Sequence, residues 1–227
     1  MFPIRDSVPS KTFPVINTLI ILINTAVFVY QWSLGPEVEV FFGAYGLIPG
    51  KFFNLIAYHP SDVVNIGMPF FTSMFMHGGL AHFFGNMWFL WIFGDNVEDR
   101  MGHGRYVIFY LLTGIGSAIA HIYFNQESSI PTVGASGAIS GIMGAYLVLY
   151  PGGKVTTYIP PFFFVAVPAF VFLIFWMIFQ TFQGIASLGI PSSTGGVAWW
   201  AHIGGFLLGA VLIFVFRKPE ERKISGF

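Results

Sequence analysis

The chain contains six apolar segments of about the length that a helix needs to cross a lipid bilayer. A spanning helix requires about 20 predominantly apolar residues. Only 9% of the 227 residues are charged, whereas a soluble domain averages about 25%, so lipid must cover much of the surface. We therefore predict an all-α polytopic membrane protein with six transmembrane helices. The six segments are residues 14–34, 68–93, 105–124, 133–150, 161–188 and 197–216.

The connection between the first two segments, residues 35–67, is aromatic in patches but broken by glycine and proline. Phe41-Phe42 and Phe52-Phe53 stand among these breakers. We expect a structured first loop that dips into the headgroup region, where aromatic side chains are stable, and not an additional span.

Basic residues are distributed unevenly between the two sides that six spans define. An even number of spans places both termini on one side, and cytoplasmic loops carry an excess of Lys and Arg. On the side opposite the termini there is only Lys51. The basic residues on the terminal side are Arg5, Lys11, Arg100, Arg105, Lys154, Arg217, Lys218, Arg222 and Lys223. This bias predicts that both termini are cytoplasmic.

These spans divide the chain into a cytoplasmic N-terminus (1–13), a six-helix membrane domain (14–216) and a cytoplasmic C-terminal tail (217–227). No small-residue cleavage site follows the first apolar segment, so we interpret it as a retained helix and not a signal peptide. We expect no further helix or soluble domain. The compact length and simple termini predict a multi-pass protein of a prokaryotic cell membrane.

Composition excludes several classes of function. The chain has no cysteine, which excludes a disulfide, a thiolate metal site and a cysteine nucleophile. The formal net charge is zero, so there is no basic footprint for nucleic acid. We expect no cofactor and no metal, and the sequence indicates no oligomeric state.

Three of the spans carry polar residues at similar depth on the side opposite the termini. Ser136 lies near the start of the fourth span and His202 about six residues into the sixth, while His77, His82 and Asn86 belong to the second. At about 1.5 Å per residue, Ser136 and His202 both lie within about 10 Å of the outer boundary. Polar groups inside a membrane are costly and are functional candidates by default.

Small residues in the fourth and sixth spans favour close approach of these two helices. Gly137 and Gly141 are four residues apart, as are Gly205 and Gly209, and this spacing is typical of tightly packed membrane helices. Gly134 belongs to the same glycine-rich stretch. Close packing is the condition for Ser136 and His202 to meet.

Ser136, His82 and Asn86 have the properties needed to stabilise an oxyanion. His82 and Asn86 are four residues apart and share one helix face, and both side chains can donate hydrogen bonds. Ser136 stands near a helix N-terminus, where unpaired backbone N–H groups face developing negative charge.

The motifs occur together in one known family. The sequence resembles the rhomboid intramembrane serine proteases over about residues 14–216, with all motifs in family order. A G-x-S-G motif alone is weak, whereas the combination is highly specific. The matching segments are Gly134-Ala135-Ser136-Gly137, Ala201-His202-Ile203-Gly204, residues 77–86 (HGGLAHFFGN) and Glu98-Asp99-Arg100.

The resemblance implies a serine endopeptidase with Ser136 as nucleophile and His202 as general base, a dyad without an acid. It assigns the oxyanion site to His82, Asn86 and the Ser136 backbone, and a structural or water-binding role to His77. Its substrates would be single-pass membrane proteins with an unstable or bent helix near the outer face.

The resemblance also implies roles for the connecting segments. Glu98 and Arg100 would fix the turn after the second helix, and residues 35–67 would be the family's membrane-dipping first loop. The fifth helix, with residues 187–196, would form a movable gate and cap.

Two features depart from patterns seen in some family members. Some members carry an aromatic residue four positions after the serine, stacked on the base histidine, and here that position is Ser140. The first loop also lacks a Trp-Arg pair that some bacterial members have. The orientation of His202 must therefore come from another part of the chain.

Three other functions are compatible with parts of this pattern. The first is a catalytically inactive rhomboid-like protein that binds transmembrane helices, although such a protein would be expected to lack the serine or the histidine. The second is a transporter or channel that uses the same polar cavity. The third is a haem or metal protein built on His77, His82, His121 and His202, but histidines five residues apart share a helix face poorly. Taken singly, Ser136 also fits helix packing, and His121 fits packing or a local hydrogen bond.

Overall fold

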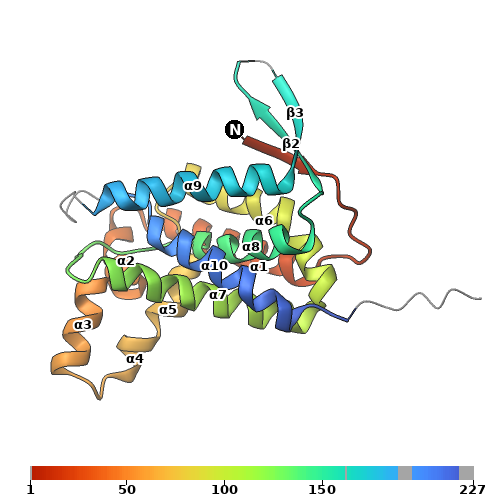
Figure 1. The fold of residues 1–227 in the computed structure, drawn as a ribbon. Helices are drawn as coiled ribbons and strands as arrows, with labels where there is room; N and C mark the ends of the chain where they lie inside the picture. The colour runs from red at the N-terminus through yellow and green to blue at the C-terminus, as the bar shows by residue number, and fades with distance from the viewer. Residues whose placement is uncertain (1, 162, 189–195, 220–227) are drawn as a thin grey trace, which may run out of the picture.

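The computed structural model describes residues 2–161, 163–188 and 196–219, and within them the chain is mostly helical (Figure 1). The α-helices are α1 (Val15–Ser33), α2 (Val38–Tyr45), α3 (Pro49–Tyr58), α4 (Val63–Gly67), α5 (Pro69–Thr72), α6 (Leu80–Met101), α7 (His103–Phe124), α8 (Ser136–Leu149), α9 (Ala169–Ser187) and α10 (Trp199–Phe216). Two short 3-10 helices are η1 (Gly35–Glu37) and η2 (Ser73–Phe75), and the strands are β1 (Phe2–Asp6), β2 (Lys154–Ile159) and β3 (Phe163–Pro168).

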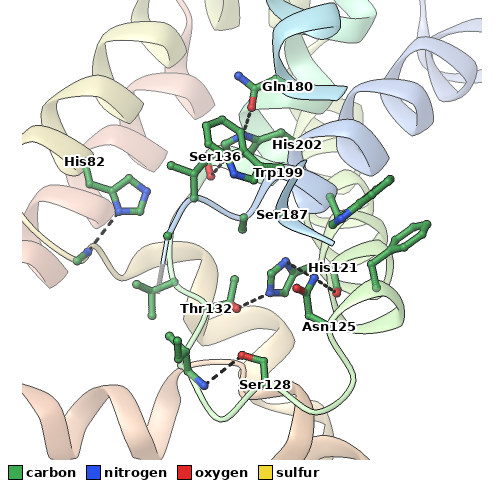
Figure 2. Close-up of a pocket in the computed structure, with 18 of the residues that line it drawn as sticks. His82, His121, Asn125, Ser128, Thr132, Ser136, Gln180, Ser187, Trp199 and His202 are labelled. Carbon is green, nitrogen blue, oxygen red and sulfur yellow. Dashed lines mark hydrogen bonds between the residues drawn. The ribbon is translucent and has the colours of Figure 1, made fainter. Parts of the chain in front are cut away.

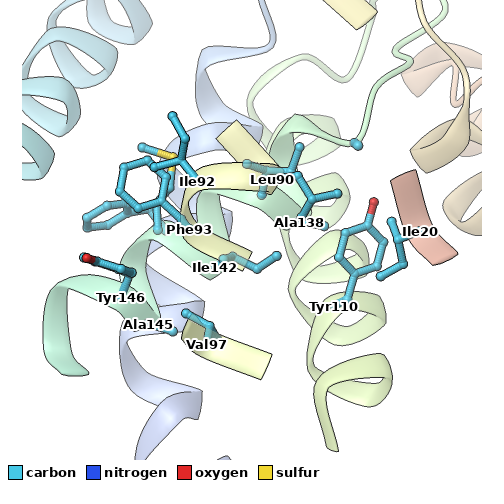
Figure 3. Packing of buried hydrophobic residues seen from close by; sticks show 14 of the residues in the cluster. Ile20, Leu90, Ile92, Phe93, Val97, Tyr110, Ala138, Ile142, Ala145 and Tyr146 are labelled. Atoms are coloured by element: carbon cyan, nitrogen blue, oxygen red, sulfur yellow. The ribbon is translucent and has the colours of Figure 1, made fainter. Parts of the chain in front are cut away.

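Helix α8 forms the centre of the bundle. It packs against α6, α7 and α10, and its residues are buried without interruption from Gly137 to Tyr146. Ile142 and Tyr146 lie in the core with Phe93 and Leu90 of α6 (Figure 3). A helix that is apolar on every side belongs inside a bundle, and this explains why the fourth apolar segment contacts neighbouring helices on all sides.

Four of the described helices, α1, α7, α9 and α10, are long and apolar enough to cross a membrane by length and composition. Their outward residues are large and apolar, such as Val29, Phe182 and Val215, which are 62%, 69% and 76% exposed. Lipid can cover this surface. The remaining two predicted spans correspond to α6, whose last two turns are charged, and to α8, which has 14 residues.

The second predicted span, residues 68–93, does not form one continuous helix. The chain forms α5 and η2, breaks at Gly79, whose φ of +159° suits extended backbone, and then enters α6 at Leu80. Helix α6 continues beyond residue 93 into the expected connection between the second and third spans and ends at Met101. His77 therefore precedes this helix and does not belong to it.

The expectation of an all-α fold is corrected by a small sheet. Strands β1, β2 and β3 form an antiparallel sheet in that order, with Asp6 opposite Val155 and Ile159 opposite Phe163. The fifth predicted span therefore contributes β3 before α9 begins at Ala169. Its β-branched and aromatic residues have high strand propensity, and apolar composition alone did not distinguish this strand from a helix.

The two ends of the bundle differ. The sheet and the end of α10 lie at one end, and α2, α3 and α4 lie at the other, beside the start of α8 (Figure 1). Residues 35–67 therefore fold as short helices. Leu47 and Thr132 exchange two backbone hydrogen bonds of 3.2 and 2.8 Å, which join this region to the loop that leads into α8.

The N-terminal strand is fixed to the end of α8 through Asp6. Its carboxylate accepts hydrogen bonds from the Tyr146 hydroxyl at 2.6 Å and from Asn96 at 3.2 Å. Burial raises the pKa of Asp6, while the Tyr146 hydrogen bond opposes that rise. The strand is thus part of the fold at this end, and not a free tail.

Glu98 caps the first helix from the last part of α6. Its fully buried carboxylate accepts backbone N–H bonds from Ile16 at 2.9 Å and Asn17 at 2.7 Å, and it also contacts His103 Nδ1 at 2.5 Å. Helix N-termini have unpaired N–H groups that favour an anion. The carboxylate therefore holds α1 against α6.

We predict that Glu98→Ala destabilises the fold, because it leaves buried N–H groups of Ile16 and Asn17 without an acceptor. Each such group costs about 1–3 kcal/mol, so the free energy of unfolding should fall by at least about 2 kcal/mol. Unfolding in detergent, followed by circular dichroism, measures this. Glu37→Ala, at an exposed glutamate, is the control and should unfold like the wild type.

Helices α8 and α10 approach closely because two glycines of α10 lie on the α8 backbone. A Cβ added to Gly205 would meet the carbonyl of Gly137, and one added to Gly209 would meet the carbonyl of Gly141. The glycines of α8 serve a different neighbour: a Cβ on Gly137 or Gly141 would meet Ser117 or Thr113 of α7. Small residues on α8 and α10 thus allow close contacts with different neighbouring helices.

Gly209→Ala should destabilise the bundle, because the added methyl group meets backbone atoms that cannot move aside. Overpacking of this kind costs roughly 1–3 kcal/mol, which in a chain of this size lowers Tm by several degrees. Gly43→Ala is the matched control, since no atom lies within 4 Å of its added Cβ. An unchanged Tm for Gly209→Ala would contradict the packing argument.

Candidate active site

Ser136 is the first residue of α8, where the loop from α7 turns into the bundle. Gly134 makes this turn with a φ of +131°, and its N–H donates to the carbonyl of Ser73 at 2.9 Å. A side chain is strained at such a φ. The loop therefore presents the Ser136 hydroxyl at the end of the helix, while the rest of α8 is buried.

Gly134 is also required by the approach of His82. A Cβ at this position would lie 2.7 Å from the His82 ring atoms Cε1 and Nε2 and 3.5 Å from Asn86 Nδ2. The missing side chain lets His82 and Asn86 of α6 reach the backbone immediately before Ser136. Three residues predicted to share a site therefore lie together, although they come from two separate helices.

His202 contacts Ser136 directly. Its Nε2 atom lies 2.8 Å from Ser136 Oγ, and its Nδ1 atom lies 2.7 Å from Gln180 Oε1 of α9 (Figure 2). Both ring nitrogens of this buried histidine are therefore in hydrogen bonds. The serine and histidine are 66 positions apart in the sequence, and the close packing of α8 and α10 brings them together.

The hydrogen bond at His82 indicates which ring nitrogen carries its proton. The N–H of Gly78 donates to His82 Nδ1 at 3.4 Å, so Nδ1 is an acceptor and Nε2 carries the hydrogen. Nε2 is one of the two ring atoms that face Gly134. His82 therefore presents a donor beside the loop that carries Ser136.

Asn86 presents a second donor. Its side chain is 7% exposed, and its Nδ2 atom has no hydrogen-bond partner among the described residues. Buried amide groups are normally satisfied, so an unpaired N–H group near Ser136 is available to a bound group. Leu90 and Phe93, four and seven residues further along α6, share the helix face of Asn86 and are fully buried, so this amide lies at the edge of the core.

His77 lies outside the cavity that contains Ser136. Its ring packs edge-on against Phe28, His82 and Phe83, with centroids 6.3, 5.2 and 5.4 Å away. Its backbone exchanges two hydrogen bonds with the Gln31 side chain. The ring therefore packs directly against His82, and neither of its buried ring nitrogens has a hydrogen-bond partner among the described residues.

The candidate site residues, apart from His77, line a cavity of about 1320 Å³. Ser136, His202, His82 and Asn86 all line it, and so does His121, whose Nε2 is 2.9 Å from Thr132 Oγ1 (Figure 2). The cavity also reaches Asn125 and Ser128 of the connecting loop. It combines polar groups with aromatic walls and is large enough to admit an extended segment together with water.

Three side chains that surround His202 were not predicted from the sequence. Gln180 Oε1 accepts the hydrogen bond from His202 Nδ1, and the ring centroids of Trp176 and Trp199 lie 5.9 and 6.3 Å from that of the imidazole. Ser140 occupies the position at which some family members carry an aromatic ring. Its hydroxyl donates a hydrogen bond to the carbonyl of Ser136 at 2.6 Å. The available signal was a glutamine in the middle of an apolar span, which is a functional candidate by the same reasoning that selected Ser136.

Two further observations concern the surroundings of the site. Among the residues with described positions, no group of three or more His, Asp or Glu side chains could hold a metal ion. The predicted cap at residues 187–196 falls largely on residues 189–195, which lie outside the described residues.

Comparison with known proteins identifies the family. A family profile described as Rhomboid domain matches residues 65–219. Rhomboid protein 1, mitochondrial, of Saccharomyces cerevisiae is 26% identical over 205 residues, which are 88% of this chain and 53% of the relative. RHOMBOID-like protein 6, mitochondrial, of Arabidopsis thaliana is 32% identical over 158 residues, which are 66% of this chain and 44% of the relative.

A bacterial relative matches over a shorter region. Rhomboid protease GluP of Bacillus subtilis is 43% identical over 76 residues, covering 34% of this chain and 14% of the relative. The matches thus span about half or less of the length of these three relatives.

The predicted location, a prokaryotic cell membrane with cytoplasmic termini, is contradicted by these comparisons. Proteins named as mitochondrial are prominent among the relatives, from yeast, Arabidopsis and rat. The prediction failed because chain length and basic residues are not specific to one kind of membrane.

The predicted resemblance is confirmed, because the family profile matches more than half of the chain, and the matched region includes both Ser136 and His202. The chain belongs to the rhomboid family.

Proposed function

We propose that this chain is an intramembrane serine endopeptidase that cleaves single-pass membrane proteins. The observation that carries this proposal is the 2.8 Å hydrogen bond between Ser136 Oγ and His202 Nε2 inside a cavity lined by polar groups. A serine becomes a useful nucleophile when a base lies within hydrogen-bond distance. Ser136 and His202 satisfy that condition without any rearrangement.

The proposed reaction begins when His202 Nε2 takes the proton of Ser136 as its oxygen attacks the scissile carbonyl. His202 then gives that proton to the leaving amine, and an acyl-enzyme remains on Ser136. Water from the cavity, deprotonated by His202, attacks the ester and releases the second product, and His202 returns the proton to Ser136 Oγ. The substrate must be unwound at the scissile bond, because helical carbonyls are hydrogen-bonded and shielded from attack.

The developing oxyanion is stabilised by donors on one side of Ser136. The unpaired Asn86 amide and the Nε2–H of His82 supply side-chain donors, and the Ser136 backbone N–H at the start of α8 supplies a third. Donors that are already in position are worth most in a site of low polarity. This arrangement distinguishes Ser136 from a serine that only fills space between helices.

We further propose that α6 and α8 complete a six-span membrane domain at residues 14–216. The 22 residues of α6 correspond to about 33 Å, enough to cross the hydrocarbon core, with the charged residues at one end. The 14 residues of α8 reach only about 21 Å, but α8 is surrounded by protein and needs no lipid contact. Residues 1–13 and 217–227 then lie on the same side.

Residues 35–67 are proposed to enter the headgroup region as the first loop. Tyr45, Phe53 and Tyr58 are exposed there at 39%, 37% and 74%, and aromatic side chains favour this region. The names of several relatives favour a mitochondrial membrane as the location.

Ser136→Ala and His202→Ala should each abolish cleavage of a transmembrane substrate and labelling by a fluorophosphonate probe, since the first removes the nucleophile and the second its base. Gel-based labelling of the purified protein in detergent measures this directly. Ser33→Ala and His59→Ala are the matched controls, both at exposed positions, and should label like the wild type.

Full labelling of folded Ser136→Ala would show that another residue is the nucleophile and would overturn the mechanism. A folded wild-type protein that neither labels nor cleaves would favour an inactive rhomboid-like protein that binds transmembrane helices. Circular dichroism of each variant separates these results from misfolding.

Asn86→Ala should lower kcat by roughly 10-fold or more through loss of one oxyanion donor, with a smaller change in KM. Asn86→Asp keeps the size of the side chain but replaces the donor by an acceptor, so its kcat should fall at least as far. Asn54→Ala, at an exposed site on α3, is the control. An unchanged kcat in both Asn86 variants would remove Asn86 from the proposed site.

A further inference from the structure

We propose that Gln180 of α9 is a positioning residue for His202 and fixes the imidazole in the form that can accept the Ser136 proton. This inference rests on the proposed chemistry of Ser136 and His202. It addresses a requirement of any two-residue site: the histidine must be held in one orientation and one tautomer without help from an acidic residue.

The hydrogen bonds of His202 define its tautomer. Gln180 Oε1, 2.7 Å from Nδ1, is an amide carbonyl oxygen and can only accept. Nδ1 must therefore carry the hydrogen, and Nε2 is left as the acceptor that faces Ser136 Oγ at 2.8 Å. The opposite tautomer would set two lone pairs against each other at Gln180 and leave no base at Ser136.

The orientation of the ring is fixed from the same helix. Trp176 and Gln180 are four residues apart on α9, so both face α10. The Trp176 ring lies 5.9 Å from the imidazole with an interplanar angle of 33°, and Trp199 closes another side at 6.3 Å and 86°. These walls fix the plane of the ring, and the Nδ1 bond to Gln180 excludes the ring flipped about χ2, which would place a carbon atom against Oε1.

The burial of Gln180 supports a specific role. Its side chain is 5% exposed, on a helix whose outward residues are large and apolar. The neighbouring hydroxyls of Thr181 and Ser187 bond to carbonyls of α9 itself, whereas Gln180 reaches across to α10. A polar side chain inside a membrane is costly unless it is satisfied, and here the partner is the proposed base.

The contact between Gln180 and His202 also explains how His202 can be oriented without an aromatic ring at position 140. The ring that some family members carry on α8 is replaced here by Ser140, which bonds to the carbonyl of Ser136. The support for His202 comes from α9, through Trp176 on one face and Gln180 at Nδ1. Orientation of the base therefore depends on how α9 packs against α10.

The test measures the rate at which a small fluorophosphonate labels Ser136, together with kcat and KM for a transmembrane substrate. Gln180→Leu and Gln180→Met remove the carbonyl oxygen, whereas Gln180→Glu keeps an accepting oxygen at the same distance from the backbone. The matched control is Gln183→Leu, the same chemical change three residues further along α9, at a side chain outside the cavity lining. Thermal unfolding in detergent is recorded for every variant.

We expect Gln180→Leu and Gln180→Met to lower the labelling rate and kcat by roughly 10-fold or more, a modest part of what a general base contributes, with KM little changed. Gln180→Glu should retain most of the wild-type rate, and Gln183→Leu all of it. The small probe does not depend on substrate contacts along α9, so parallel loss of labelling and kcat identifies an effect through His202.

Wild-type labelling rates in a folded Gln180→Leu or Gln180→Met variant would overturn the inference while leaving the proposed function intact. Equal loss in folded Gln180→Glu and Gln180→Leu would also overturn it, because the accepting oxygen would then be irrelevant. If wild-type labelling does not depend on Ser136, the proposed function fails, and the inference fails with it.

Discussion

The contact between α8 and α10 is the constraint on which the rest of the structure depends. Gly205 and Gly209 rest against the carbonyls of Gly137 and Gly141, and no side chain can be placed between them. In a membrane, where lipid is as apolar as the helix surface, such packing is a main source of helix association. The same contact fixes the separation of Ser136 and His202, so the packing of the bundle and the geometry of the site have one cause.

The short length of α8 explains where the cavity lies. In the proposed six-span arrangement, a central helix of 14 residues reaches about two-thirds of the way across a bilayer core, and the loop with Gly134 occupies the remaining depth. Non-helical backbone at that depth is tolerated only where it is buried in protein or lines a water-filled space. The residues around Ser136 meet this condition, because they line the cavity of about 1320 Å³. The cavity thus lies beyond the N-terminal end of α8, because this central helix is too short to fill that space.

The sequence was informative where a single physical rule dominates. Apolar length located α1, α7 and α10 to within about two residues, and glycine spacing indicated the tight packing of α8 and α10. It was less informative where apolar composition fits two structures: residues 163–168 form β3 because they pair with β2, a tertiary effect. The spans predicted at residues 68–93 and 105–124 left residues 94–104 as a connection, yet α6 continues to Met101, and Glu98 in this part of the helix caps α1. Gln180 was missed because its importance depends on a neighbour 22 residues away.

The choice of an amide next to His202 has a physical rationale in a membrane. In a soluble serine protease, a buried carboxylate orients the histidine and stabilises its cation. A carboxylate at residue 180 would lie in an apolar span, where burying a charge that is unpaired before reaction is costly. The Gln180 carbonyl gives the same directional bond to Nδ1 without a net charge. In the proposed reaction, the cost of that solution is weaker stabilisation of the imidazolium, which would place more of the electrostatic role on the donors proposed at His82, Asn86 and the start of α8.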